Sequence, residues 1–438
     1  MSKSLLSLHF ASCCLFSSLA FAAEENPLTR FVNNVEYELD SSATGYFKKV
    51  ESNKADNDDV AFLTRLTAKS KTQLNDSLSA GMELYANYSS QKQEYYGVFR
   101  NPDHQVRQPR IVDFNSAWLR YEADDFEVLA GKDYLQTGLS EIYSPVDRFG
   151  LYNLTNPSQF YRTGVWQAGI KYFIDDDTVT FKVMPVTEKN LIPSPYSRWL
   201  GNTNDPEFAA LAANLQVEEK FRPVRIENTG YLLQYKGSRA GYDFFGLLHH
   251  GPSMYPTLTY GGQANQAIKT EPLATSISTG IMKVLEEWKF YGEAIYQVAD
   301  NNTDEDFIRY SVGTSYNDSQ LANILGFNQI TTTLQWSGDE SVNPANTLKV
   351  ALTSREARPF RNTVLTKIEI EQNNEWGYYF SAAYNVEGNS ALAAGAQYKP
   401  TDNLSLRLES TLFDGPKDTV FGRWDNNDLL RLRTIYKF

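Results

Sequence analysis

Alternation of apolar and polar residues along most of this chain predicts β-strands. From residue 35 to residue 438, segments of about ten residues recur in which every second position is apolar. Successive side chains of a strand point to opposite faces, so each segment would have one apolar and one polar face. The clearest segments are 78–88, 166–172, 288–298, 308–316, 378–386 and 429–438.

The connections between these segments favour a closed barrel. Tight polar connections at 123–125, 175–177, 237–239 and 285–287 alternate with long ones at 89–112, 134–163, 185–228 and 251–275. We therefore predict an all-β fold, a closed antiparallel transmembrane β-barrel of about 18 strands, with 16 to 20 as the range. A direct count gives about nineteen, but chain ends on one side of the membrane require an even number. The alternation of loop lengths fails between Asp300 and Trp376, where we expect the error to lie.

The amino-terminal residues predict an export signal. Lys3 precedes an apolar stretch over residues 5–19, and Ala20-Phe21-Ala22 has the small-X-small form of a cleavage site. We expect residues 1–22 to be a signal peptide, 23–34 a short periplasmic segment and 35–438 the barrel. Both cysteines, Cys13 and Cys14, lie in the predicted signal, which excludes disulfides and thiolate metal sites from the mature chain.

Composition narrows the function further. Aromatic residues make up 13% of the chain, yet the mean hydropathy is only −0.45, a pairing expected when one face of each strand meets lipid. A net charge of −12 argues against nucleic acid as a partner. There is no phosphate-binding loop and no dinucleotide fingerprint, so we predict no cofactor. The acidic stretch from Asp300 to Asp306 lacks the Gly at the sixth place and the Glu at the twelfth place of a calcium loop, so we predict no metal.

Three segments resemble those of Gram-negative outer-membrane barrels. The last strand, ending on Phe438, is similar to their terminal strand, and residues 117–121 and 128–133 resemble a hairpin common in porins. Residues 144–157, after that hairpin, are similar to the constricting loop of such proteins. The resemblance, which is to porin-like and alginate-export-type barrels, implies an outer-membrane location among lipid and lipopolysaccharide. It also implies recognition of the last strand by the barrel-assembly machinery, and leaves a homo-oligomer open.

If the apolar faces meet lipid, the opposite faces line the lumen. The residues that we predict to line the pore are Arg65, Lys69, Glu83, Trp118, Arg120, Lys171, Arg309, Arg407, Glu409, Arg431 and Arg433. Closure of the barrel should bring the arginines of the last two strands close to Arg65 and Lys69. Such a basic ladder could orient anionic solutes; alternatively, these charges are salt bridges that stiffen the wall.

These observations favour a channel for small hydrophilic solutes, with a preference for anions, narrowed or gated by the loops after Tyr134 and Pro185. A plugged barrel that binds a ligand or has a structural role is the alternative. A lipid hydrolase is a lesser one, because His249 and Ser253 lie close together in the sequence. No nucleophile elbow surrounds this serine, so we predict no catalytic residues and no enzyme activity.

Overall fold

The structure of the chain is a computed structural model. It describes residues 26–50, 58–100, 107–159, 161–186, 188–200, 205, 207–208, 215–344 and 350–438. The predicted signal peptide lies outside the described residues and stays a prediction.

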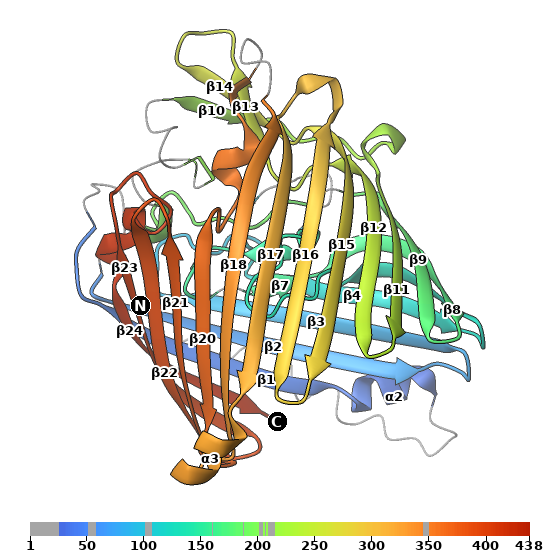
Figure 1. Cartoon of the computed structure of the whole chain (residues 1–438), viewed down its shortest axis with the longest axis vertical. Coiled ribbons are helices and arrows are strands. Elements are labelled where there is room, and N and C mark those ends of the chain that lie inside the picture. The colour runs from blue at the N-terminus through green and yellow to red at the C-terminus, as the bar shows by residue number, and fades with distance from the viewer. Residues whose placement is uncertain are drawn as a thin grey trace, which may run out of the picture.

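Eighteen strands of the described chain form one closed antiparallel sheet (Figure 1). They are β1 (Glu36–Tyr46), β2 (Val60–Gln73), β3 (Leu78–Ser89), β4 (Val112–Glu122), β5 (Phe126–Asp133), β8 (Val165–Ile174), β9 (Asp177–Met184), β11 (Gly230–Arg239), β12 (Tyr242–Pro252), β15 (Leu273–Leu285), β16 (Trp288–Ala299), β17 (Asp306–Asn317), β18 (Gln329–Asn343), β20 (Thr363–Glu371), β21 (Trp376–Asn385), β22 (Asn389–Thr401), β23 (Leu404–Asp414) and β24 (Leu429–Lys437). The prediction of a closed barrel of about 18 strands is confirmed.

The sheet closes because its first and last strands pair. β1 runs antiparallel to β24, with Glu38 opposite Lys437 and Tyr46 opposite Leu429. No barrel strand of the described chain is therefore left with an unpaired edge, as a spanning sheet requires in hydrocarbon. We call the end with the β2–β3 and β4–β5 connections the turn end and the opposite end the loop end.

The structure also explains why loop lengths misled the strand count. At the loop end, β16 and β17 are joined by only residues 300–305, which include the 3-10 helix η4 (Asp300–Asn302). At the turn end, the connection from β17 to β18 is longer and carries helix α3 (Ser319–Leu325). Here the connection at the turn end is therefore longer than the one at the loop end, which is the reverse of the usual pattern. The predicted turn at 237–239 was also wrong: these residues belong to β11, and Ala240 and Gly241 make the turn with positive φ values of 54° and 76°.

Side chains sort between the two faces as the alternation predicts. On β2, the outward Phe62 and Leu66 are 52% and 39% exposed, whereas the inward Arg65 and Thr67 are each 4% exposed. The exterior is thus an apolar surface suited to lipid, and the lumen is polar and filled. No helix among the described residues is long and apolar enough to cross a membrane.

Helix α2 (Pro27–Asn33) occupies most of the described part of the predicted N-terminal segment and lies near the turn end (Figure 1). It contacts the outer face of β2, where the Ser70 hydroxyl donates a 2.5 Å hydrogen bond to the Phe31 carbonyl. Ser70 and Thr72 point outward but are only 6% and 4% exposed. The helix therefore covers two polar residues that would otherwise face lipid.

The loop end carries the remaining elements. Strands β6 (Leu151–Asn153) and β7 (Tyr161–Thr163) pair within the β5–β8 loop. A four-stranded sheet above the barrel mouth combines β10 (Gln216–Glu219), β13 (Thr257–Tyr260), β14 (Gln266–Thr270) and β19 (Val350–Leu352), which come from three different loops (Figure 1). The 3-10 helices η2 (Arg198–Leu200), η3 (Ile226–Asn228), η5 (Ser354–Ala357) and η6 (Gly422–Asn427) complete this end.

Candidate functional site

The β5–β8 loop, residues 134–164, folds into the barrel and contacts the far wall. Its Leu139 amide donates a 2.7 Å hydrogen bond to Glu293 of β16. Its Ser140 hydroxyl lies 2.6 Å from that of Ser311 on β17, and its Ile142 amide donates to Gln335 of β18 at 3.2 Å. Inward side chains of three consecutive strands therefore hold the loop across the lumen.

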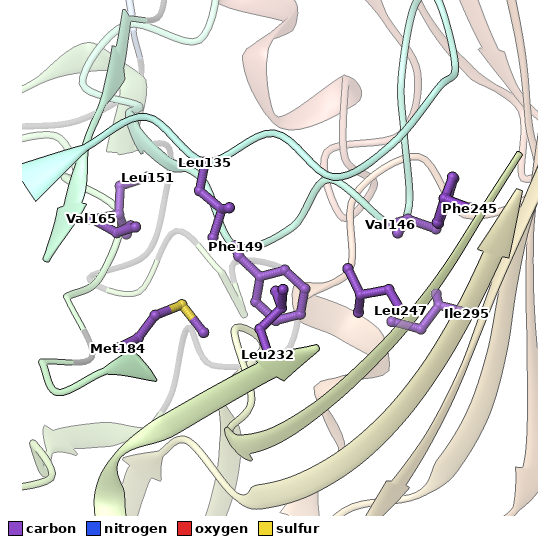
Figure 2. Close-up of a cluster of buried hydrophobic side chains, with 10 residues drawn as sticks. All are labelled: Leu135, Val146, Phe149, Leu151, Val165, Met184, Leu232, Phe245, Leu247 and Ile295. Carbon is purple, nitrogen blue, oxygen red and sulfur yellow. The ribbon is translucent and has the colours of Figure 1, made fainter. Parts of the chain in front are cut away.

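Apolar packing seals the lumen on one side of this loop. Phe149 and Val146 of the loop pack with Leu232, Leu247 and other inward apolar residues of β9, β11, β12 and β16 (Figure 2). Leu232 and Val146 are fully buried. Arg148 adds polar anchors, because its guanidinium donates to Ser276 at 2.8 Å and also to Gln297. The described side chains on this side of the loop are therefore packed mainly against one another.

A second loop lies between β9 and β11, and its described residues, which include 188–200, cover part of the barrel mouth. Its Trp199 is 1% exposed and packs edge-on against Tyr46, Phe413 and Trp424, at ring-centroid distances of 6.2, 5.9 and 6.0 Å. The neighbouring Arg198 donates to Asn427 at 2.8 Å. Both predicted loops therefore fold over the lumen, and this one joins opposite sides of its rim.

Ion pairs tie the mouth sheet together. Lys269 lies 2.5 Å from Glu207 and 3.1 Å from Asp205, and Arg107 lies 2.7 Å from Glu207 and 3.0 Å from Glu219. Burial by itself would raise the pKa of Glu207, but the charges of Arg107 and Lys269 outweigh it and lower that pKa below its ordinary value. These charges are mutually satisfied, so we regard the cluster as structural.

A polar cavity of about 350 Å³ remains on the other side of the β5–β8 loop. It lies between this loop and the wall formed by β1 to β4 and β24. Its lining consists of Glu38, Asp40, Arg65, Thr67, Lys69, Glu83, Asn115, Tyr134, Tyr161, Arg162 and Arg433. Four of these side chains are basic and three are acidic. Three of the predicted arginines and lysines, Arg65, Lys69 and Arg433, thus meet at one cavity.

Three basic residues of the cavity have carboxylate partners. Arg433 makes a bidentate contact with Asp40, at 2.8 and 2.6 Å, and the Tyr161 hydroxyl donates to the same carboxylate at 2.9 Å. Arg162 lies 2.6 Å from Asp147. Lys69 lies 4.0 Å from Glu83, whose carboxylate also accepts from Asn115 and Tyr134 at 2.6 and 3.1 Å.

Arg65 differs from these three. Its guanidinium carbon lies 4.0 Å from the ring centroid of Tyr85 and 4.6 Å from that of Tyr161, so the group stacks between two tyrosines. Among the described residues it has neither a carboxylate within 4.0 Å nor a hydrogen bond. The flat faces of the guanidinium are therefore covered, while its donors remain open to the cavity.

The other predicted residues lie outside this cavity. Arg120 stacks on Trp118, with its guanidinium carbon 4.7 Å from the ring centroid, and Lys171 lies 3.7 Å from Glu127. Arg407 is opposite Arg433 on the neighbouring strand, and Glu409 is 3.6 Å from Arg431.

Two predicted arginines do not present their charge to the lumen. Arg309 is 0% exposed and pairs with Asp339 at 2.9 Å. Arg431 is 1% exposed, and its guanidinium donates to Ser158 of the folded-in loop and to Thr44 of β1. The alternation placed both on the inward face correctly, but loops then covered them.

Sequence reasoning missed several residues of the cavity. Asp40 alternates with Glu38 and Ser42 along β1, so the periodic pattern contained the signal for it. Tyr134, Tyr161 and Arg162 belong to the β5–β8 loop or to its short hairpin, where no long alternation exists. Only the folded path of this loop brings them to the cavity.

His249 and Ser253, the basis of the hydrolase hypothesis, do not hydrogen-bond to each other in the described structure. The His249 ring packs on Phe149 at a centroid distance of 4.5 Å. The Ser253 hydroxyl accepts from Gln297 and from the Tyr255 amide, both at 3.2 Å. Both residues are buried, at 2% and 1% exposure. Their contacts are those of packing rather than of a base aimed at a nucleophile.

Comparison with known proteins supports the fold. No protein-family model and no curated protein sequence matches the chain. The solved structure of OccD3 (OpdP) from Pseudomonas aeruginosa aligns with a TM-score of 0.50 and 10% identity, covering 96% of this chain and 95% of that one. OccAB3 from Acinetobacter baumannii also aligns at 0.50 and 10%, covering 93% and 99%. Together with the closed eighteen-stranded sheet of the described residues, these alignments show that the chain has the closed β-barrel fold of these two proteins.

Proposed function

We propose that the protein is an outer-membrane channel for small hydrophilic solutes and that it prefers anions. The observation that carries this proposal is the polar cavity of about 350 Å³ between the β5–β8 loop and the wall. Because the opposite side of the loop is sealed by apolar packing, solutes would follow the wall formed by β1 to β4 and β24. Polar lining groups would replace part of the hydration shell of a solute along this route.

The anion preference depends mainly on Arg65. The charges of Arg433, Arg162 and Lys69 are each offset by a carboxylate within 4.0 Å. Arg65 has no carboxylate within 4.0 Å among the described residues, and Glu38, the third acidic side chain of the lining, lies opposite Thr67, two positions along β2 from Arg65. The charge of Arg65 therefore acts locally on a solute, in a confined space where a charge is poorly screened. Its open donors suit a carboxylate or another planar anion.

Ion selectivity in planar bilayers tests this proposal. In a salt gradient the wild-type channel should show a reversal potential on the anion-selective side, and Arg65→Ala should shift it towards cation selectivity. Arg65→Lys should retain more of the preference because it keeps the charge. Arg239→Ala is a matched control, since Arg239 is an arginine on the outer face of β11, paired with Asp177 at 2.6 Å. An unchanged reversal potential in Arg65→Ala would contradict the role of this residue.

The plugged barrel remains the second candidate, because the apolar cluster around Phe149 and the rings around Trp199 fill much of the lumen. A barrel of this kind would bind a ligand with its loops or have a structural role. Conductance recordings in planar bilayers separate the two candidates. The protein used must be correctly folded, which is checked by the change of its electrophoretic migration on heating. Steady conductance supports the channel, and its absence supports the plugged barrel.

Contacts with the envelope form a further part of the proposal. Lipid and lipopolysaccharide would surround the apolar exterior, and the barrel-assembly machinery would recognise the aromatic outer face of β24. On that face Phe438 stacks on Tyr37 of β1 and on Tyr436, at centroid distances of 5.5 and 5.6 Å. These rings reinforce the seam where the barrel closes. A homo-oligomer remains open.

A further inference from the structure

Helix α3 lies on the outside of the barrel wall at the turn end (Figure 1). It contacts β18 and buries Ala322 to 1% exposure. Ile330 of β18 points outward, yet it is only 5% exposed, whereas Leu334, four residues further on the same face, is 53% exposed. The helix segment therefore covers the outer face of β18 at its first residues.

Local sequence explains both ends of this helix. The Asp318 side chain accepts a 2.9 Å hydrogen bond from the Leu321 amide, which caps the first turn. Gly326 then adopts a left-handed conformation, with a φ of 69°, and ends the helix. α3 is therefore a defined helix with its own start and stop signals.

The face of α3 turned away from β18 is apolar and exposed. Leu321, Ile324 and Leu325 follow helical spacing, and they are 42%, 80% and 51% exposed. The seven residues of the helix include no charged side chain. Exposed aliphatic side chains on an uncharged helix would be unfavourable in water.

The outer surface of the barrel near helix α3 is suited to lipid. Tyr316 of β17, three residues before the helix, packs on Trp288 of β16 at a centroid distance of 4.5 Å. Both rings lie on the outer face near the turn end, where an aromatic girdle marks the membrane interface. The exposed face of α3 thus continues the lipid-facing surface of the barrel.

We propose that α3 is an interfacial helix, embedded by Leu321, Ile324 and Leu325 in the lipid leaflet at the turn end. The helix lies along the membrane surface and covers the beginning of β18, so that lipid acyl chains meet aliphatic side chains there. This role does not depend on solute transport, and it would hold for an open or a plugged barrel.

The accessibility of a spin label on α3 to oxygen and to a nickel chelate shows, in the full-length protein, whether the helix lies in lipid or in water. A nitroxide is attached at Ile324→Cys, with Cys13 and Cys14 replaced by Ser, and the protein is reconstituted in phosphatidylethanolamine and phosphatidylglycerol vesicles. Oxygen, which concentrates in acyl chains, and a water-soluble nickel chelate are the two relaxing agents. Val312→Cys, on the outer face of β17 and 58% exposed, is the lipid reference. Asn323→Cys, the neighbouring polar position, is the water reference.

We expect the label at residue 324 to resemble the Val312 label, with high oxygen and low nickel accessibility, and to differ clearly from the Asn323 label. Accessibility equal to that of the Asn323 label would overturn the proposal, because the helix would then lie in water. An immobilised label shielded from both agents, or dipolar broadening between labels, would also overturn it and indicate a second copy or another protein on this face.

Discussion

At the scale of single residues, the buried arginines of this barrel differ in the partners of their guanidinium groups. Arg309 and Arg358 both pair with Asp339, at 2.9 and 2.7 Å, and Arg358 also pairs with Glu305 at 2.5 Å. Arg65, in contrast, meets the faces of two tyrosines, and it has no carboxylate partner within the part of the chain that the structure describes. When a buried arginine has carboxylate partners, they engage its hydrogen-bond donors. When it contacts only aromatic faces, its donors stay accessible to a ligand.

Glu94, in the loop after β3, provides a pH-dependent prediction. It is 5% exposed, and burial raises its pKa to about 7, although a hydrogen bond from Ser89 opposes this. Between pH 4.5, the ordinary pKa of a glutamate, and about pH 7, the folded loop holds a proton that the unfolded chain has released. Stability is therefore lost as the pH rises through this window, and the penalty persists above it.

Replacement of Glu94 by Gln should remove this penalty. We expect Glu94→Gln to stabilise the loop by up to about 3 kcal/mol at pH 8 and to have little effect at pH 4. Amide hydrogen exchange of residues 90–100, compared between variant and wild type at each pH, measures the difference. Equal protection at pH 8 would show that this carboxyl is not desolvated in the native loop.

At the scale of elements, inward aromatic rings pack over inward glycines of the neighbouring strand. An added Cβ would lie 2.3 Å from Trp118 at Gly81, 2.3 Å from Phe245 at Gly280, 2.5 Å from Tyr291 at Gly313 and 2.4 Å from Tyr379 at Gly395. Each glycine leaves space for a ring that lies flat against the wall, so that four inward aromatics reinforce the sheet instead of projecting into the lumen. The alternation predicted that Trp118 points inward, but the partner glycines follow only from strand register.

Gly280→Ala tests this packing. We expect it to destabilise the barrel by about 1–3 kcal/mol, because its methyl group displaces the Phe245 ring. Gly292→Ala is the matched control on the adjacent strand: it points outward, and its added Cβ would meet nothing closer than 3.8 Å. Its effect should remain within about 0.5 kcal/mol. Urea-induced unfolding from lipid vesicles gives both values, and equal stability of the two variants would contradict the prediction.

At the scale of the whole molecule, the β5–β8 loop divides the lumen into an apolar side and a polar side. The apolar side joins the loop to β9, β11, β12 and β16, and the polar side contains the cavity next to β1 and β24. The channel that we propose is therefore eccentric and follows the seam where the chain closes on itself.

Shortening this loop should widen the channel. We expect replacement of residues 139–147 by a short glycine-serine linker to raise single-channel conductance by roughly twofold or more, because the segment that contacts β16, β17 and β18 is removed. Shortening the β13–β14 hairpin at residues 262–265 is the control, since this tip belongs to the sheet above the mouth. Unchanged conductance after the first deletion would mean that another segment sets the narrowest point.

The sequence by itself determined the barrel, the approximate strand number and the apolar face of its clearest strands. These properties are local, because alternation with a period of two residues places successive side chains on the lipid-facing and the lumen-facing side of a strand. This placement does not depend on distant parts of the chain. Because closure pairs the first strand with the last, the sequence also predicted that Arg407, Arg431 and Arg433 would lie near Arg65 and Lys69. Arg433 lines the cavity with these two residues, whereas Arg407 and Arg431 are not among its lining residues.

Only the tertiary structure decided which charges stay accessible. Tyr161 stacks on Arg65 and Ser158 covers Arg431 because a loop without periodic pattern takes one path across the lumen. The same holds for α3, whose contact with β18 explains why the outward Ile330 is buried. Such contacts join residues far apart in the sequence and depend on the packing of the whole chain, so no local pattern encodes them.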